Sequence, residues 1–140
     1  TASRVGMDFY TDKNVHTSDA KDYVDNVYDK GHMAPAADFN CTKEMLYKTF
    51  SYVNCTLQHK DLNRGLWKEL EAYEKELAAT HAVTVKIQIE FTKITRVATG
   101  AAIPTGFTKT IYLEGKPFKS YYFPNQSLVG SFEKFLVKKY

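Results

Sequence analysis

The sequence of 140 residues contains few cysteines and no long apolar run. Its two cysteines, Cys41 and Cys55, are too few for a disulfide-rich scaffold and leave open one bridge or none. No stretch of about 18 apolar residues occurs, so we expect no membrane-spanning helix and no membrane partner. Internal repeats, low-complexity stretches and linkers are also absent. These absences favour a single globular domain over residues 1–140.

Metal-binding spacing and a strong charge imbalance are absent as well. The four histidines and two cysteines form no two closely spaced ligand pairs, which excludes the common zinc motifs. Lys and Arg number 19 against 16 Asp and Glu, giving a net charge of +3. This surplus permits an anionic partner without requiring one, because dedicated nucleic-acid modules usually have a pI above about 9.

Helical periodicity is clearest over Asp61–Thr80. One apolar stripe there follows steps of three and four residues and consists of Leu62, Leu66, Leu70, Tyr73 and Leu77. A shorter helix is expected over Lys43–Phe50 with Thr42 as its N-cap. Between the two helices, Tyr52–Gln58 is β-branched and aromatic and is expected to be extended.

The second half of the sequence changes to a period of two. Apolar and polar residues alternate over Val83–Phe91, which predicts a half-buried strand, and Glu114–Pro117 joins two further strands. We also expect a terminal helix over Leu128–Lys138. At the other end, short strands are expected over Arg4–Tyr10, Asn14–Thr17 and Asn26–His32. Helices interspersed with antiparallel strands, without a βαβ rhythm, indicate an α+β fold.

The segment Asp29–Phe39 is the first that suggests chemistry. His32 follows a glycine and precedes a proline-containing loop, where backbone bends and solvent can reach the ring. A histidine with an ordinary pKa near 6.5 can take a proton from water at neutral pH. Lys30 supplies positive charge nearby. A single histidine beside a turn is more often structural than catalytic, so this segment alone decides nothing.

A second group of candidates lies on the long predicted helix. Asn63, Trp67, Glu71 and Lys75 follow one another at steps of four residues and so share one ridge. Amide and carboxylate oxygens are hard ligands suited to Mg²⁺, with Asn63 as a direct ligand and Glu71 holding the water shell. The alternatives are a solvated helix face and, for Trp67, packing in the core.

Three segments together resemble the DNA/RNA non-specific endonuclease family, which includes secreted bacterial nucleases and mitochondrial endonuclease G. The family pattern is DRGH, then S-N-x-x-P-Q, then L-N-x-G-x-W-x-x-L-E. The corresponding segments here are Asp29–His32, Val53–Gln58 and Leu62–Glu71. The resemblance extends from about Phe9 to Leu77.

The resemblance implies a ββα-metal fold, a central antiparallel sheet flanked by helices, and Mg²⁺-dependent hydrolysis of DNA or RNA phosphodiester bonds with little sequence specificity and 5′-phosphate ends. Mn²⁺ is the alternative cation. His32 would be the general base, Asn63 the direct metal ligand, and Glu71 a ligand through water. Asn54 would orient the site. Lys30, Arg64 and Lys75 are the expected contacts to substrate phosphates. A non-catalytic nucleic-acid-binding relative of the same fold is the alternative function.

The sequence also departs from the family pattern. Lys30 replaces the arginine of the first motif and loses bidentate phosphate geometry, and Leu57 replaces a proline. The chain begins at Thr1, so we expect that an upstream segment has been removed and that an N-terminal part of the family fold is missing. Such processing slightly favours a secreted or organellar compartment. A homodimer is a further expectation from relatives, although no interface is legible in the sequence.

Overall fold

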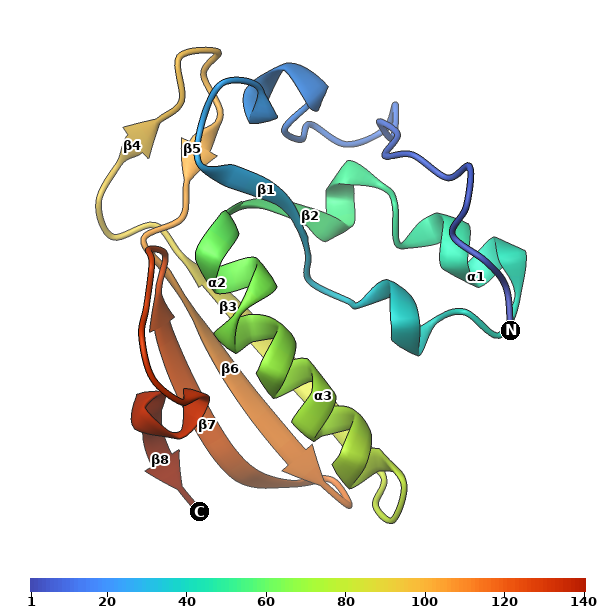
Figure 1. Ribbon diagram of the computed structural model, residues 1–140, viewed down its shortest axis with the longest axis vertical. Helices are drawn as coiled ribbons and strands as arrows, with labels where there is room; N and C mark the ends of the chain where they lie inside the picture. Colours follow the sequence, from blue (N-terminus) through green and yellow to red (C-terminus); the bar gives the residue numbers. More distant parts are fainter.

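A four-stranded antiparallel sheet is the largest sheet of this computed structural model, which describes residues 1–140 (Figure 1). Its strand order is β3-β6-β7-β8, and two small two-stranded sheets pair β1 with β2 and β4 with β5. The strands are β1 (Tyr28–His32), β2 (Cys55–His59), β3 (Val83–Glu90), β4 (Thr95–Arg96), β5 (Ala102–Ile103), β6 (Gly106–Leu113), β7 (Lys116–Pro124) and β8 (Leu136–Lys139). The α-helices are α1 (Lys43–Lys48), α2 (Lys60–Arg64) and α3 (Leu66–Ala78), and the 3-10 helices are η1 (Ala20–Tyr23), η2 (Ala36–Asp38), η3 (Tyr52–Asn54) and η4 (Phe132–Phe135).

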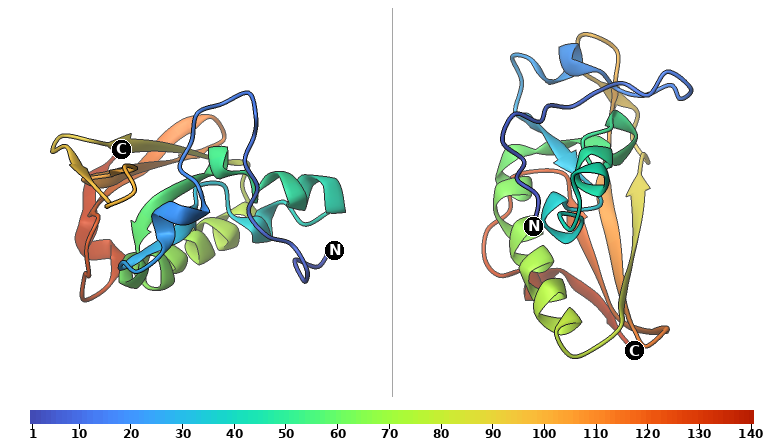
Figure 2. Two further views of the ribbon diagram at one scale, coloured as in Figure 1. Left: turned by 90° about the horizontal axis from the view of Figure 1, so that it is seen from above. Right: turned by 90° about the vertical axis from the view of Figure 1, so that its right-hand side faces the viewer.

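The core lies between helices α2–α3 and one face of the large sheet. Figure 2 (right) shows α3 on one side of the sheet and no helix on the other. The eight residues of the core cluster come from both layers: Leu62, Leu66, Trp67, Leu70, Phe107, Ile111, Tyr121 and Phe123. Each large apolar side chain buried in this way contributes about 1.5–3 kcal/mol. The core therefore fixes the helical ridge that carries Asn63 and Glu71 against the sheet.

The long helix predicted over Asp61–Thr80 is present but divided. Gly65 separates α2 from α3 with φ −108° and ψ −109°. A Cβ at Gly65 would lie 2.6 Å from the carbonyl oxygen of Asp61, so a side chain at this position would clash with the backbone. The apolar stripe nevertheless continues across the break, because Leu62 and Leu66 both reach the same core.

Several other predicted elements are confirmed. The small helix begins after Thr42, whose hydroxyl accepts from Met45 N at 3.1 Å. The alternating strand forms β3, and its pairing with β6 runs from Val83↔Leu113 to Glu90↔Gly106. Trp67 is fully buried, as the core-packing interpretation predicted. The α+β fold class and the antiparallel central sheet are likewise confirmed.

Other predictions about local structure are wrong. Leu128–Lys138 is not a helix: it forms the short η4 and then β8, which pairs with β7 and is an edge strand of the large sheet. Arg4–Tyr10 and Asn14–Thr17 are not strands, and their only ladder contact is an isolated bridge between Tyr10 and Ser51. The extended segment Tyr52–Gln58 begins with η3 before β2 starts. Cys41 and Cys55 are both free thiols, and no helix has the length and apolarity needed to cross a membrane.

Candidate active site

The pairing of β1 with β2 places His32 at the end of a short antiparallel ladder, opposite Cys55. The preceding Gly31 is buried, and a Cβ there would lie 2.6 Å from Oε1 of Gln58. The absence of a side chain at Gly31 therefore lets the two strands approach closely just before the histidine. After His32 the chain leaves the ladder and enters the loop with η2.

The imidazole of His32 lies between two phenylalanine rings. Its ring centroid is 4.9 Å from that of Phe9 and 4.9 Å from that of Phe50, in tilted and edge-on geometry respectively. Nε2 is buried and has no hydrogen-bond partner. Burial, with a smaller effect from the cation of Arg4, lowers the pKa of His32 from 6.5 to about 4. The ring is therefore neutral at physiological pH and able to accept a proton.

Asn54 holds the loop that follows His32. Its Nδ2 donates to the carbonyl oxygens of Ala34 at 2.9 Å and Thr49 at 3.1 Å, and its Oδ1 accepts from Ala34 N at 2.8 Å. A backbone bond from Met33 N to Asn54 O adds a further contact of 2.9 Å. Both ends of the side-chain amide are thus committed to backbone, and Asn54 does not line the cavity beside the histidine.

That cavity, of about 510 Å³, is lined by residues from the end of β1, the η2 loop and helices α2 and α3. All the other residues singled out from the sequence line it: Lys30, His32, Asn63, Arg64, Glu71 and Lys75. They come from segments more than thirty positions apart in the sequence. The structure therefore brings the histidine of the first motif and the oxygen donors of the third motif to one surface.

Glu71 is the most perturbed carboxyl group of the cavity. Burial raises its pKa from 4.5 to about 7, and the neighbouring carboxylates of Glu74 and Asp38 act in the same direction. Lys109 and Lys68 oppose the change, but by less than the burial effect. A bound cation beside Glu71 would favour its ionised form.

The charged and aromatic lining residues that were not identified as site residues from the sequence are Arg4, Phe9, Asp38 and Lys68. Arg4 and Phe9 belong to the N-terminal segment, which has no regular structure and so gives no periodic signal. The guanidinium carbon of Arg4 is 5.2 Å from the centroid of the Phe50 ring, and Nζ of Lys30 is 5.5 Å from that of Phe9. The cationic groups of Arg4 and Lys30 therefore lie near the two phenylalanine rings that flank His32.

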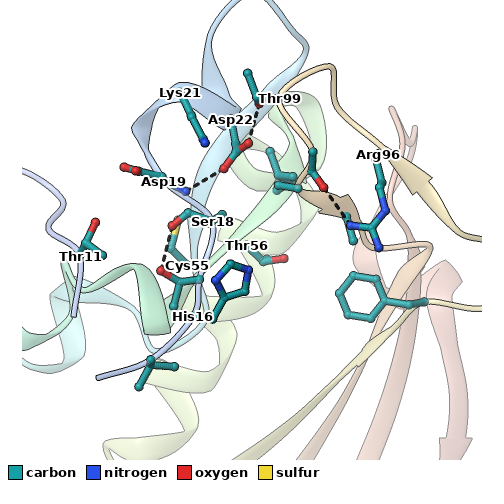
Figure 3. A pocket seen from close by; sticks show the side chains of 17 residues that line it. Thr11, His16, Ser18, Asp19, Lys21, Asp22, Cys55, Thr56, Arg96 and Thr99 are labelled. Carbon is teal, nitrogen blue, oxygen red and sulfur yellow. Dashed lines mark hydrogen bonds between the residues drawn. The ribbon is translucent and has the colours of Figure 1, made fainter. Parts of the chain in front are cut away.

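A larger cavity of about 630 Å³ lies elsewhere, between η1, β2 and the β4–β5 ribbon (Figure 3). Three of its charged side chains, Asp19, Asp22 and Arg96, form hydrogen bonds with backbone or with a hydroxyl group. Asp22 accepts from Thr99 Oγ1 at 2.5 Å and from Asp19 N at 2.8 Å, and Arg96 donates to the carbonyl of Gly100. None of the residues predicted to be functional lines this cavity. The hydrogen bond between Asp22 and Thr99 joins η1 to the β4–β5 ribbon.

Comparison with known proteins identifies the family of this chain. The family model described as DNA/RNA non-specific endonuclease matches residues 1–139. Mitochondrial endonuclease G of Bos taurus is 27% identical over 145 residues, which cover 88% of this chain and 48% of the relative. Mitochondrial nuclease EXOG of Danio rerio is 34% identical over 79 residues, covering 54% of this chain and 23% of the relative.

A solved structure gives the same result. A chain in the crystal structure of the EndoG/EndoGI complex, described with the mechanism of EndoG inhibition, superposes with a TM-score of 0.83 at 29% identity. The superposition covers 98% of this chain and 65% of that chain. This chain thus spans about half the length of the endonuclease G relative. The family match over residues 1–139 and the shared fold show that the chain belongs to the DNA/RNA non-specific endonuclease family.

Proposed function

We propose that this chain is a divalent-metal-dependent endonuclease that hydrolyses phosphodiester bonds of DNA or RNA with little sequence preference, uses Mg²⁺ and leaves 5′-phosphate ends. The observation that carries the proposal is the single cavity lined by His32, Asn63 and Glu71 together with several cationic side chains. A neutral base, hard oxygen ligands and positive charge are the three requirements for in-line attack of water on a phosphodiester.

His32 is the proposed general base. Its Nε2 is sealed from solvent, so we assign the proton acceptor to Nδ1. The pKa of about 4 keeps the imidazole unprotonated at neutral pH, which is the state a base requires. The contacts with Phe9 and Phe50 restrict the ring and so reduce the cost of orienting it toward a bound water.

The donor set fits a hard cation. No group of three or more His, Cys, Asp or Glu residues gathers in the structure, which argues against a closed zinc-type cage. Asn63 and Glu71 offer amide and carboxylate oxygens, and Mg²⁺ characteristically keeps several waters when few protein ligands are present. When bound, such a cation supplies Lewis-acid stabilisation of charge on the phosphate and the leaving oxygen.

Positive side chains around the cavity are the proposed contacts to the substrate backbone. Lys30 and Lys75 lie at the cavity, and neither takes part in a salt bridge. Arg64, by contrast, forms a bidentate pair with Asp29 at 2.9 and 2.8 Å. We therefore propose Lys30 and Lys75 as the principal phosphate contacts, with Arg64 contributing only as far as Asp29 leaves its guanidinium accessible. Binding dominated by such contacts weakens steeply with salt.

Conversion of supercoiled plasmid to nicked and linear forms tests the proposal. Cleavage is expected with Mg²⁺ and not with EDTA, and His32→Ala and Asn63→Ala are each expected to reduce it by at least about 100-fold. Asn14→Ala, an exposed amide distant from the cavity lining, is the matched control. A salt-sensitive gel shift without cleavage would instead support the non-catalytic binding function. Sedimentation of the same preparations distinguishes a monomer from the proposed homodimer.

A further inference from the structure

The carboxylate of Asp29 receives three N–H donors from two consecutive residues of α2. Nδ2 of Asn63 donates to Oδ2 at 2.9 Å, Nε of Arg64 donates to the same oxygen at 2.9 Å, and Nη2 of Arg64 donates to Oδ1 at 2.8 Å. Asp29 lies in β1, three residues before His32. One side chain therefore joins the strand that ends in the histidine to the helix that carries the amide.

These contacts have a directional consequence for Asn63. The two ends of a carboxamide have nearly the same shape, but only the NH₂ end can donate to a carboxylate. The negative charge of Asp29 also repels the amide oxygen. Asp29 therefore selects the rotamer in which the NH₂ group faces β1 and Oδ1 is the free end of the side chain.

The contacts provide little stability by comparison. The side chain of Arg64 is 68% exposed, and that of Asp29 is 20% exposed. Ion pairs this close to solvent typically contribute little to the free energy of unfolding. Because both oxygens of Asp29 are occupied by donors, Asp29 is also poorly placed to act as a metal ligand or a base itself.

We propose that Asp29 is a positioning residue that presents Oδ1 of Asn63 to the divalent cation. The inference rests on the proposed function, because it assigns Asp29 a role through the proposed metal ligand. Without Asp29 the amide is free to rotate, and the orientation that turns its NH₂ group toward the cation offers no ligand atom. Residues that orient a metal ligand typically change metal affinity by about 10–100-fold.

Binding of Mn²⁺ without nucleic acid, followed by electron paramagnetic resonance of the free ion, measures this role independently of cleavage. Asp29→Ala is expected to weaken Mn²⁺ binding about tenfold or more. Arg64→Ala is the matched control, because it removes the other partner of Asp29 and leaves Asn63 held; its affinity is expected to stay within about twofold. In the double variant Asp29→Ala/Asn63→Ala, affinity is expected to equal that of Asn63→Ala alone.

Cleavage kinetics supply a second readout. Asp29→Ala is expected to raise the Mg²⁺ concentration that gives half-maximal rate about tenfold, while retaining most of the rate at saturating Mg²⁺. A merely structural role would instead lower the rate at saturating Mg²⁺ together with the melting temperature, which circular dichroism monitors. Asp29→Asn, which keeps one acceptor oxygen, is expected to lie between the wild type and Asp29→Ala.

These outcomes distinguish failure of the positioning role of Asp29 from failure of the proposed metal site at Asn63. If Asn63→Ala weakens Mn²⁺ binding but Asp29→Ala behaves like Arg64→Ala, the positioning role is wrong and the proposed metal ligand stands. If the losses from Asp29→Ala and Asn63→Ala are additive, Asp29 does not act through Asn63. If Asn63→Ala leaves Mn²⁺ binding unchanged, the proposed metal site and this inference fail together.

Discussion

Nζ of Lys109 lies 2.8 Å from Oε2 of Glu74, and both side chains are almost completely buried, at 1% and 6% exposure. The same ammonium is 4.0 Å from the centroid of the Trp67 ring. Lys109 lies on β6 and Glu74 on α3, so an ion pair joins the large sheet to the helix that carries Glu71. This pair is a buried polar contact in the interface between the helix and the sheet.

Removing only Lys109 should be more damaging than removing the whole pair. Lys109→Met leaves the Glu74 carboxylate buried without a partner, and we expect a loss of about 3–5 kcal/mol in the free energy of unfolding. The double variant Lys109→Met/Glu74→Leu removes both charges and is expected to recover most of that loss. Urea unfolding measures all three proteins. Equal stability of the single and double variants would show that the buried charge is not the cause.

The pH dependence of stability should contain two opposing contributions from the site. His32 has its pKa lowered from 6.5 to about 4, so it binds fewer protons in the native state and favours folding increasingly as pH rises from about 4 to 6.5. Glu71 has its pKa raised from 4.5 to about 7, so it binds more protons in the native state, and its contribution is lost as pH rises toward 7.

Single variants separate these contributions in the metal-free protein. Relative to wild type, Glu71→Gln is expected to become more stable as pH rises from 4.5 to 7, whereas His32→Gln is expected to become less stable between pH 4 and 6.5. Urea unfolding at a series of pH values provides the comparison. Curves parallel to wild type would mean that neither group has a shifted pKa.

Lys30 replaces the arginine of the first family motif and offers a gain-of-function test. Lys30→Arg restores two parallel donors to a phosphate, so we expect kcat/KM for plasmid cleavage to rise on the order of threefold to tenfold. Lys30→Ala should lower it and reduce the slope of log binding constant against log salt by ~0.9, the value of one phosphate contact. An unchanged salt slope would remove Lys30 from the substrate contacts.

Gly31 should tolerate no side chain. A Cβ at this position lies 2.6 Å from Oε1 and 2.8 Å from Cβ of Gln58, so Gly31→Ala is expected to cost about 1–3 kcal/mol in unfolding free energy and to displace His32. Gly31→Ala/Gln58→Gly removes both the Oε1 and the Cβ contact and is expected to recover activity in part. A fully active, stable Gly31→Ala would contradict the close strand approach described for the site.

The elements with a strong hydrophobic period are the ones that sequence reasoning predicted well. The stripe over Asp61–Thr80 and the alternation over Val83–Phe91 each record burial of one face, and both elements form. The spacing of Leu128, Phe132 and Phe135 also reports a real apolar face, since all three pack on the core. The same spacing gave the wrong secondary structure, because the segment forms η4 and its end pairs with β7 as strand β8.

For the site, motif spacing predicted some of the residues, whereas residues placed by long-range contacts were missed. Motif spacing identified His32 and Asn63, and the structure brings both to one cavity. Arg4 belongs to a segment without periodicity whose position depends on long-range contacts, such as the backbone bond from Ala2 N to Asn40 O. The role of Asp29 depends on hydrogen bonds across 34 and 35 positions of sequence, and no local pattern predicts such contacts.

We propose that His32 and Asn63 act at one hydrated cation, with Asn63 as its ligand and His32 as the base that accepts a proton from water. A crystal structure of the protein soaked in Mn²⁺, with data collected for anomalous scattering, tests it directly. We predict an anomalous peak roughly 2 Å from Oδ1 of Asn63, with its waters reaching Glu71 and the imidazole of His32. An anomalous peak elsewhere in the cavity, beyond coordination distance of Oδ1 of Asn63, would contradict this proposal.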